Sequence, residues 1–228
     1  MEPETADTTA LIVAAGRGRR AGGETPKQWR EIAGAPVLAH SLAAFADHPR
    51  IAALVLVVAP EDDARAAALP LPRGTRLVHG GAERSHSVRA GLEGIDTRNV
   101  LIHDAARPCV SRAVIDGVLR ALDRAPAAAP AVPVTDALWR GLHGEVIGVV
   151  PRDDLWRAQT PQGFRTQLIR AAHAELKTPA ADDVAAARAA GIAVTITEGD
   201  EDNIKITGPG DFARAEAILR ARHGHQTG

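Results

Sequence analysis

Cysteine is almost absent from this 228-residue chain, and tyrosine is missing altogether. Cys109 is the single cysteine, so no internal disulfide can form, and small folds held together by disulfides are excluded. A lone thiol suits a reducing compartment, and we therefore expect a cytoplasmic protein. Because 45% of the residues are hydrophobic, the chain can bury a core of its own, and we expect a single domain over residues 1–228.

Long hydrophobic runs and an excess of one charge are also missing. No segment reaches the roughly 18 uninterrupted apolar residues of a membrane span. The N-terminal MEPETADTT lacks the basic and apolar regions of a signal peptide. Lys+Arg 27 against Asp+Glu 28 gives a formal net charge of -1, so no general basic field attracts nucleic acid. We expect neither a membrane nor a nucleic-acid partner, and any anion site must be local.

Short apolar runs alternate with segments of helical spacing. Four runs have the uninterrupted hydrophobicity of strands buried on both faces: Thr9–Ala14, Ala53–Ala59, Thr75–His79 and Asn99–His103. Helical spacing occurs at 36–45, 61–69, 85–95 and 111–125, with Pro36 expected at the first helical position. Helices at 164–176 and 182–190, strands at 193–197 and 203–207, and a helix from Pro209 complete the pattern. This alternation predicts an α/β fold, Rossmann-like and doubly wound, with a mostly parallel sheet.

Residues 133–162 break this rhythm. Two apolar pieces surround the turn-like HGEV without a long helix, which predicts a protruding β-arm. Its apolar side chains would be unfavourable alone in water, so either a partner subunit covers the arm or the arm folds back on its own domain; we prefer the first interpretation. These side chains are Leu138, Trp139, Val146, Ile147, Val149 and Val150.

A glycine-rich loop follows the first predicted strand, in LIVAAGRGRRAGGETPK, at the sheet edge where such folds bind ligands. Its glycines fit the spacing of a dinucleotide fingerprint, but Pro26 and the two glycines before Glu24 prevent a helix from opening at once. A P-loop needs Lys and Ser/Thr where Glu24 and Thr25 stand, so that interpretation fails.

The same loop can instead wrap a triphosphate. Backbone N–H groups near Ala15–Gly18 would form an anion-binding nest, and Arg19, Arg20 and Lys27 would neutralise charge. Two arginines and a lysine on one loop suit phosphoryl or nucleotidyl transfer. The alternative is a solvated basic loop.

Three other segments add polar groups that fit this interpretation. IHDAARP places Asp104 at the end of the fourth strand, as a ligand for Mg²⁺ or as a cap of the next turn. GGAERSHSV offers Ser87 at a helix start, as a ligand group or as a helix cap. DNIKIT puts Lys205 on a predicted strand among apolar neighbours, which is unusual unless the side chain points at an anion.

Five ordered motifs, AAGRGRR…PKQW, GGAERSHSV, HDAARP, RAQTPQGF and DNIKIT, resemble the 2-C-methyl-D-erythritol 4-phosphate cytidylyltransferase family of the non-mevalonate isoprenoid pathway. The resemblance spans residues 10–222. It implies a nucleotide-binding α/β domain whose β-arm builds a homodimer and helps to complete the neighbour's site. It also implies that CTP and methylerythritol phosphate react, with Mg²⁺, to give CDP-methylerythritol and pyrophosphate.

The resemblance also assigns roles to single residues. Arg20, Lys27 and Lys205 would stabilise the triphosphate and the pentacoordinate α-phosphorus, and Asp104 would bind the metal. Arg107, Arg152 and Thr160 match the region that receives the sugar phosphate, where Asp136 would bind acceptor hydroxyls or carry a solvated charge. The residues matching those that hold CTP are Ala14, Ala15, Gly16, Gly81, Ser87 and Ala105.

Two departures leave the acceptor open. Ala137 and Ala181 stand where the family pattern has threonines that help to bind the acceptor phosphate. Each lost hydroxyl would remove about 0.5 to 1.5 kcal/mol of binding free energy. A cytidylyltransferase for another polyol phosphate, such as ribitol 5-phosphate, is therefore the alternative. A dehydrogenase and a non-catalytic nucleotide sensor are the alternatives from other classes.

Overall fold

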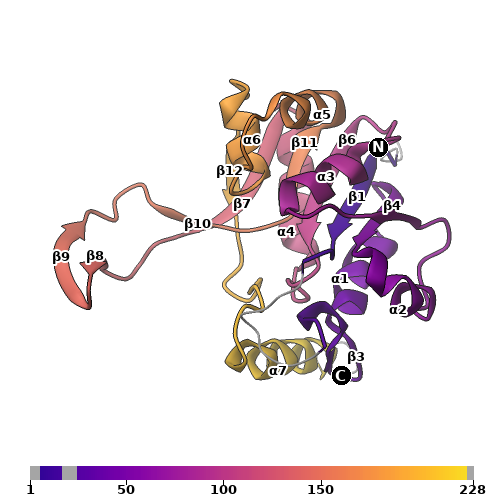
Figure 1. Ribbon diagram of the computed structural model, residues 1–228, viewed down its shortest axis with the longest axis horizontal. Coiled ribbons are helices and arrows are strands. Elements are labelled where there is room, and N and C mark those ends of the chain that lie inside the picture. The colour runs from indigo at the N-terminus through magenta and orange to yellow at the C-terminus, as the bar shows by residue number, and fades with distance from the viewer. Residues whose placement is uncertain (1–5, 17–24, 225–228) are drawn as a thin grey trace.

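A mixed eight-stranded sheet forms the centre of the computed structural model, which describes residues 6–16 and 25–224 (Figure 1). The strands run in the order β10-β7-β11-β6-β1-β4-β5, and β12 also pairs with β7. In chain order they are β1 (Thr8–Val13), β4 (Ile51–Val58), β5 (Arg76–His79), β6 (Asn99–Asp104), β7 (Ala127–Pro133), β10 (Trp156–Ala158), β11 (Gln162–Arg165) and β12 (Thr195–Glu198).

The pairing confirms the predicted α/β class. β1 pairs in parallel with both β4 and β6, β4 with β5, and β12 with β7. Only β11, between β6 and β7, and the short β10 run antiparallel to their neighbours. Because β1 lies between two parallel neighbours and is covered on both faces, its residues form one apolar run rather than an alternating pattern.

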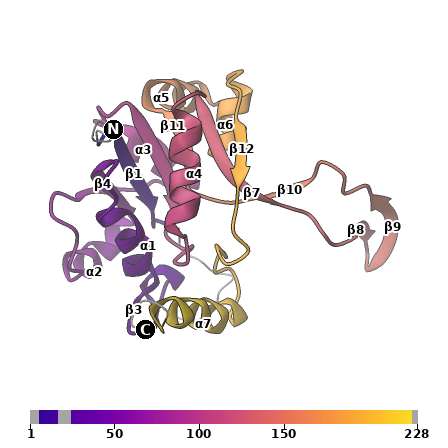
Figure 2. The same ribbon diagram turned by 180° about the vertical axis from the view of Figure 1, so that it is seen from behind.

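Helices cover both faces of the sheet, as the two opposite views show (Figures 1 and 2). On one face, Ala10 and Ile12 pack in a core with side chains of α1 and α4. On the other, Leu11 packs with side chains of α3, α5 and α6. The helices are α1 (Val37–Ala46), α2 (Asp63–Ala67), α3 (Arg84–Leu92), α4 (Arg112–Leu122), α5 (Thr166–Glu175), α6 (Asp183–Ala189) and α7 (Gly210–Gly224). Within the described residues, no helix is long and apolar enough to cross a membrane.

A third apolar cluster holds the C-terminal helix α7 beneath the sheet and against the segment after the glycine-rich loop. Ile32 of the small strand β2 (Glu31–Ile32), which pairs with β3 (Ala35–Pro36), packs with Ile206 and with Phe212 of α7. Lys27 and Lys205 each lie close in sequence to this cluster. It therefore brings the segment after the glycine-rich loop and the segment before α7 together at one edge of the sheet.

Three element predictions were wrong in detail. Helix α1 begins at Val37, so Pro36 precedes the helix and pairs in β3. The predicted helix at 61–69 is a 3-10 turn at Pro60–Asp62 followed by the short α2. Residues 203–207 do not form a strand. Their carbonyls bind side chains instead, because Arg107 donates to the Asn203 oxygen and Lys27 to the Ile206 oxygen.

The arm contains a β-hairpin that projects away from the sheet (Figures 1 and 2). Strands β8 (Leu138–Leu142) and β9 (Glu145–Val150) pair in antiparallel fashion around His143 and Gly144. Both loop residues have positive φ, 50° and 87°, as a two-residue hairpin turn with the right twist requires. Beyond the hairpin the chain rejoins the body, since β10 pairs with β7.

Candidate active site

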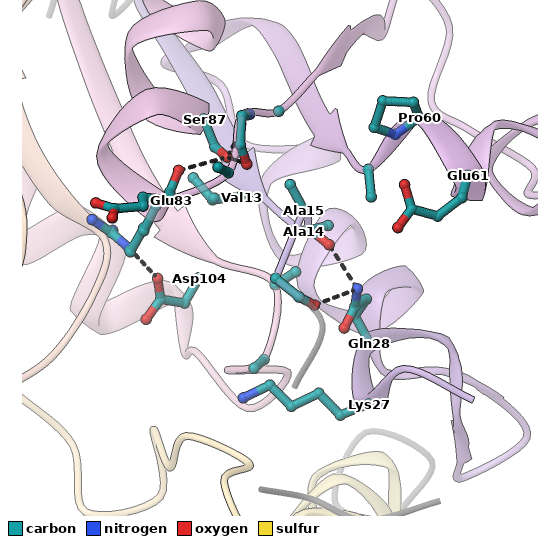
Figure 3. A pocket seen from close by; sticks show the side chains of 18 of the residues that line it. Val13, Ala14, Ala15, Lys27, Gln28, Pro60, Glu61, Glu83, Ser87 and Asp104 are labelled. Atoms are coloured by element: carbon teal, nitrogen blue, oxygen red, sulfur yellow. Dashed lines mark hydrogen bonds and ion pairs between the residues drawn. The ribbon is translucent and has the colours of Figure 1, made fainter. Parts of the chain in front are cut away.

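A pocket of about 780 Å³ opens at the carboxyl ends of β1, β4 and β6 (Figure 3). Loops after these strands, the start of α3 and the segment before α7 supply its walls. This is the edge at which an open α/β sheet binds its ligands. Nine of the sequence-predicted site residues line it: Ala14, Ala15, Gly16, Lys27, Gly81, Ser87, Asp104, Ala105 and Lys205.

The Gly80-Gly81 pair lets one wall of the pocket approach β1 closely. A Cβ atom at Gly80 would collide with the Ala15 methyl and lie 2.6 Å from Ser87 Oγ. Ser87 is the fourth residue of α3, so it does not cap the helix. Its hydroxyl donates to the Glu83 carbonyl at 3.1 Å and accepts from the Gly81 N–H at 3.2 Å. Ser87 therefore fixes the glycine turn that faces the ligand space.

Asp104 is held between two cations at the end of β6. Its Oδ2 accepts from Lys205 Nζ at 2.7 Å, and its Oδ1 accepts from Arg84 Nε at 3.1 Å. Burial alone would raise the pKa of Asp104, but the charges of Arg84 and Lys205 outweigh it and hold the pKa well below its usual range. The carboxylate is therefore ionised throughout the neutral pH range.

Arg84 connects Asp104 with a second carboxylate. Its Nη2 donates to Asp183 Oδ2 at 2.7 Å, and Asp183 is fully buried. Burial would raise the pKa of Asp183, but Arg84 and a 3.1 Å hydrogen bond from His173 lower it. Arg84 was not among the residues predicted for the site. Its place within GGAERSHSV, beside the glycine turn, was the available signal.

His103 and Thr160 fix the backbone of Asp104 from behind. The Asp104 N–H donates to Thr160 Oγ1 at 3.2 Å, and His103 Nδ1 lies 3.0 Å from the same hydroxyl. His103 Nε2 lies 3.1 Å from the Arg107 carbonyl, so it carries the ring proton and Nδ1 accepts from Thr160. Burial lowers the pKa of His103 to about 4. Thr160 was predicted to lie in the region that receives the sugar phosphate. It contacts Asp104 and His103 instead and does not line the pocket.

Lys27 and Gln28 follow the glycine-rich loop in the short 3-10 helix η2 (Lys27–Trp29). Lys27 Nζ donates to the Ile206 carbonyl at 2.7 Å, beside Lys205. Gln28 Nε2 donates to the Ala14 carbonyl at 2.7 Å and to the Gly16 carbonyl at 3.0 Å (Figure 3). Gln28 is 3% exposed. It was not among the predicted site residues, although it stands within the motif PKQW.

The remaining predicted residues lie elsewhere. Arg107 donates to the carbonyls of Asn203 at 2.6 Å and Ala158 at 3.1 Å, and burial lowers its pKa. Arg152 donates to the Thr135 carbonyl near the base of the arm, and Asp136 is exposed there. None of these three lines the pocket. Arg20, together with Arg19, lies outside the described residues.

A metal ion at this pocket would depend on its ligand for most of its coordination. No group of three His, Cys, Asp or Glu side chains is placed to hold a metal within residues 6–16 and 25–224. A carboxylate offers about four lone-pair sites, and the contacts of Asp104 with Arg84 and Lys205 use two of them. Mg²⁺ commonly takes one or two carboxylates together with substrate phosphates. Asp104 fits such a site.

Known proteins resemble this chain over nearly its whole length. A family model described as "IspD: 2-C-methyl-D-erythritol 4-phosphate cytidylyltransferase" matches residues 8–221. A protein of that name from Cereibacter sphaeroides is 57% identical over 217 residues, which cover 93% of this chain and 96% of the relative. One from Roseobacter denitrificans is 56% identical over 218 residues, covering 95% and 98%.

A solved structure also matches closely. The crystal structure of 2-C-methyl-D-erythritol 4-phosphate cytidylyltransferase from Thermus thermophilus superposes with a TM-score of 0.77 at 36% identity. The match covers 92% of this chain and 98% of that one. The shared fold therefore extends over nearly the whole of both chains.

Proposed function

The chain belongs to the 2-C-methyl-D-erythritol 4-phosphate cytidylyltransferase family, and we propose that its pocket joins CTP to 2-C-methyl-D-erythritol 4-phosphate with release of pyrophosphate. The observation that carries the proposal is the charged group of Asp104, Arg84 and Lys205 beside a wall of small residues and glycines. The cations would neutralise the negative charge of the triphosphate, and the wall of glycines leaves room for the cytosine base.

The reaction needs positioning more than proton transfer. The acceptor phosphate is already an anionic nucleophile, so its oxygen attacks the α-phosphorus of CTP as the bond to the pyrophosphate oxygen breaks. Negative charge grows on the phosphoryl oxygens and on the leaving pyrophosphate. We assign its neutralisation to Lys27, Lys205 and Arg20. The support from the geometry is that Lys27 and Lys205 line one pocket and that Lys27 binds the carbonyl of the residue next to Lys205.

The base is read by backbone groups. Ala14 and Ala15 follow β1 with side chains no larger than a methyl, and Gly16 and Gly81 have none. A ligand can therefore approach their N–H and C=O groups directly, and a pyrimidine is selected by the width of the space. Gln28 binds the Ala14 and Gly16 carbonyls from the buried side and so holds these groups in place.

We propose Mg²⁺ as the cofactor, with Asp104 as its protein ligand. The bound ion would neutralise charge on the triphosphate oxygens and orient them. The residues around Asp104 prepare the site. Arg84 and Lys205 keep the carboxylate ionised, and Thr160 fixes the backbone from which it extends.

We propose that two chains form a homodimer through the arm. Trp139 and Val149 of the hairpin are 65% and 71% exposed, which is unfavourable unless a partner covers them. Arg152 and Asp136 lie near the base of the arm and do not line the pocket of their own chain. These two side chains would act on the acceptor in the partner subunit's site, as the resemblance to the family implies.

The test is product formation from purified protein, CTP and Mg²⁺ with each of two acceptors, methylerythritol phosphate and ribitol 5-phosphate. We expect pyrophosphate release and a CDP-linked product with methylerythritol phosphate. Turnover with ribitol 5-phosphate alone would overturn the assignment of the acceptor while keeping the cytidylyltransferase chemistry. The absence of turnover with both acceptors would overturn the proposal. Removing Mg²⁺ with a chelator tests the cofactor separately.

A further inference from the structure

A second, smaller crevice lies between helices α3 and α5. It measures about 80 Å³, the volume of roughly two to three water molecules in the liquid. Ser85, His86 and Arg89 of α3 line it, whereas Arg84 and Ser87 line the nucleotide pocket. At about 100° per residue, these two sets fall on opposite faces of the helix. The crevice is therefore separate from the nucleotide pocket.

The lining of the crevice suits an anion. Six of its eight described lining residues carry groups that donate hydrogen bonds, and none of the eight is acidic. The donors are Ser85, His86, Arg89, His173, Lys177 and Thr178. The whole chain has a formal net charge of only -1, so this concentration of cations is local. A tetrahedral oxyanion with several acceptor oxygens matches such a set of donors.

The two strongest cations of the crevice have no partner within the described part of the chain. No hydrogen bond or ion pair joins Arg89 or Lys177 to another side chain or carbonyl among the described residues. Two exposed arginines elsewhere do have acidic partners, Arg157 with Glu201 and Arg220 with Glu216. Arg89 and Lys177 are thus available for a ligand.

His173 forms the buried side of the crevice. It is 4% exposed, and its Nε2 donates to the buried Asp183 at 3.1 Å. Its other ring nitrogen, Nδ1, is buried and has no hydrogen-bond partner among the described residues. A buried polar atom without a partner costs free energy, and in a native protein it calls for an unseen water or ligand. A group bound in the crevice would supply that partner to Nδ1, directly or through a water.

We propose that the crevice between α3 and α5 binds a phosphate-sized oxyanion through Arg89, Lys177 and His173. The chemistry is that of one phosphate group, supplied either as the free ion or as the end of a phosphate ester. Bound there, the anion lies beside the His173–Asp183–Arg84 chain of hydrogen bonds that ends at Asp104.

The chain offers a residue-resolved test, because it contains only three lysines, Lys27, Lys177 and Lys205. Acylation of the folded protein by an amine-reactive reagent, read by peptide mass spectrometry, reports the nucleotide pocket and the crevice separately. Inorganic phosphate is titrated at constant ionic strength set by sodium chloride. We expect saturable protection of Lys177, and an Arg89→Ala variant should raise the half-protecting phosphate concentration at least tenfold.

The controls separate phosphate binding at the crevice from general screening of charge by salt. An Arg220→Ala variant removes an exposed arginine elsewhere and should leave the protection of Lys177 unchanged. Glycerol 3-phosphate in place of inorganic phosphate distinguishes the sources, since equal protection means that an ester is accepted. The proposal is overturned if phosphate fails to protect Lys177, if sodium chloride alone protects it equally, or if Arg89→Ala has no effect. Histidine side-chain NMR gives a second readout, in which phosphate should shift the His173 signals and Arg89→Ala should suppress that shift.

Discussion

Lys205 Nζ lies 2.7 Å from Asp104 Oδ2, although 101 positions separate the two residues in the chain. Arg84 completes the arrangement from the other carboxylate oxygen at 3.1 Å. The ion pair stands at the pocket edge, with the Lys205 side chain 38% exposed and that of Asp104 12% exposed. Lys205 is therefore held by a fixed carboxylate while remaining open to a ligand.

Replacing either pocket lysine by methionine tests the charge assigned to it. Lys27→Met or Lys205→Met keeps most of the side-chain length and removes the ammonium group. We expect kcat to fall by about 100-fold or more, roughly 3 kcal/mol in the activation free energy, because a preorganised charge stabiliser is lost. Steady-state kinetics measures it, with Arg220→Met on the exposed face of α7 as the control. A loss of tenfold or less in kcat would contradict these roles.

Gln28 offers a test of how the base is held. Gln28→Glu keeps the shape of the side chain but replaces the donating amide by a carboxylate, which would repel the carbonyls of Ala14 and Gly16. We expect the KM for CTP to rise at least tenfold, while kcat at saturating CTP falls by a smaller factor than KM rises.

A matched comparison is Gln28→Met, which removes the hydrogen bonds without adding charge and should have a smaller effect on the KM for CTP. Thermal unfolding of the three proteins checks that the fold is intact. An equal loss of kcat and of kcat/KM, with the KM for CTP unchanged, would show that Gln28 does not position the base.

The lowered pKa of His103 predicts that the stability of the folded protein depends on pH. Its pKa in the folded protein is about 4, below the usual value near 6.5, because it is buried. Between these values the unfolded chain binds more protons than the folded one, so stability is complete above about pH 6.5 and falls as the pH decreases. From pH 7.5 to pH 5 this one group should cost about 2 kcal/mol of unfolding free energy.

Urea unfolding of wild type and His103→Gln at the two pH values isolates that contribution. Glutamine retains a donor and an acceptor but does not titrate in this range. The variant should be less stable at pH 7.5, yet its stability should fall by about 2 kcal/mol less on going to pH 5. An equal fall in both proteins would show that His103 does not set this dependence.

The proposed exchange of arms between subunits predicts complementation. Lys27→Ala should inactivate the site of its own chain, and Arg152→Ala should inactivate the site of its partner. After the two inactive variants are unfolded together and refolded as a mixture, half of the dimers are mixed, and each mixed dimer has one intact site. Activity should therefore recover to about a quarter of wild type. A mixture as inactive as its components would exclude a shared site.

Much of the fold could be read from the sequence because its signals are local. The apolar run before Ala14 is uninterrupted since β1 is buried between two parallel strands and two helical layers. The two apolar pieces on either side of His143 and Gly144 predicted a hairpin, because a two-residue turn needs residues that adopt positive φ. Residues 203–207 were wrongly predicted to form a strand. Arg107 and Lys27 bind carbonyls of this segment, and both are too distant in the chain for a local pattern to show the contact.

The site divides in the same way. The sequence by itself determined where small residues, glycines and cations follow the strands, and hence that Ala14, Lys27 and Asp104 meet at one edge of the sheet. Only the tertiary structure decided which charges pair. Arg84 bridging Asp104 to Asp183, Gln28 binding the Ala14 carbonyl and the burial of His173 Nδ1 all depend on side chains from separate elements. Such contacts are set by packing across the sheet, which no local pattern of residues records.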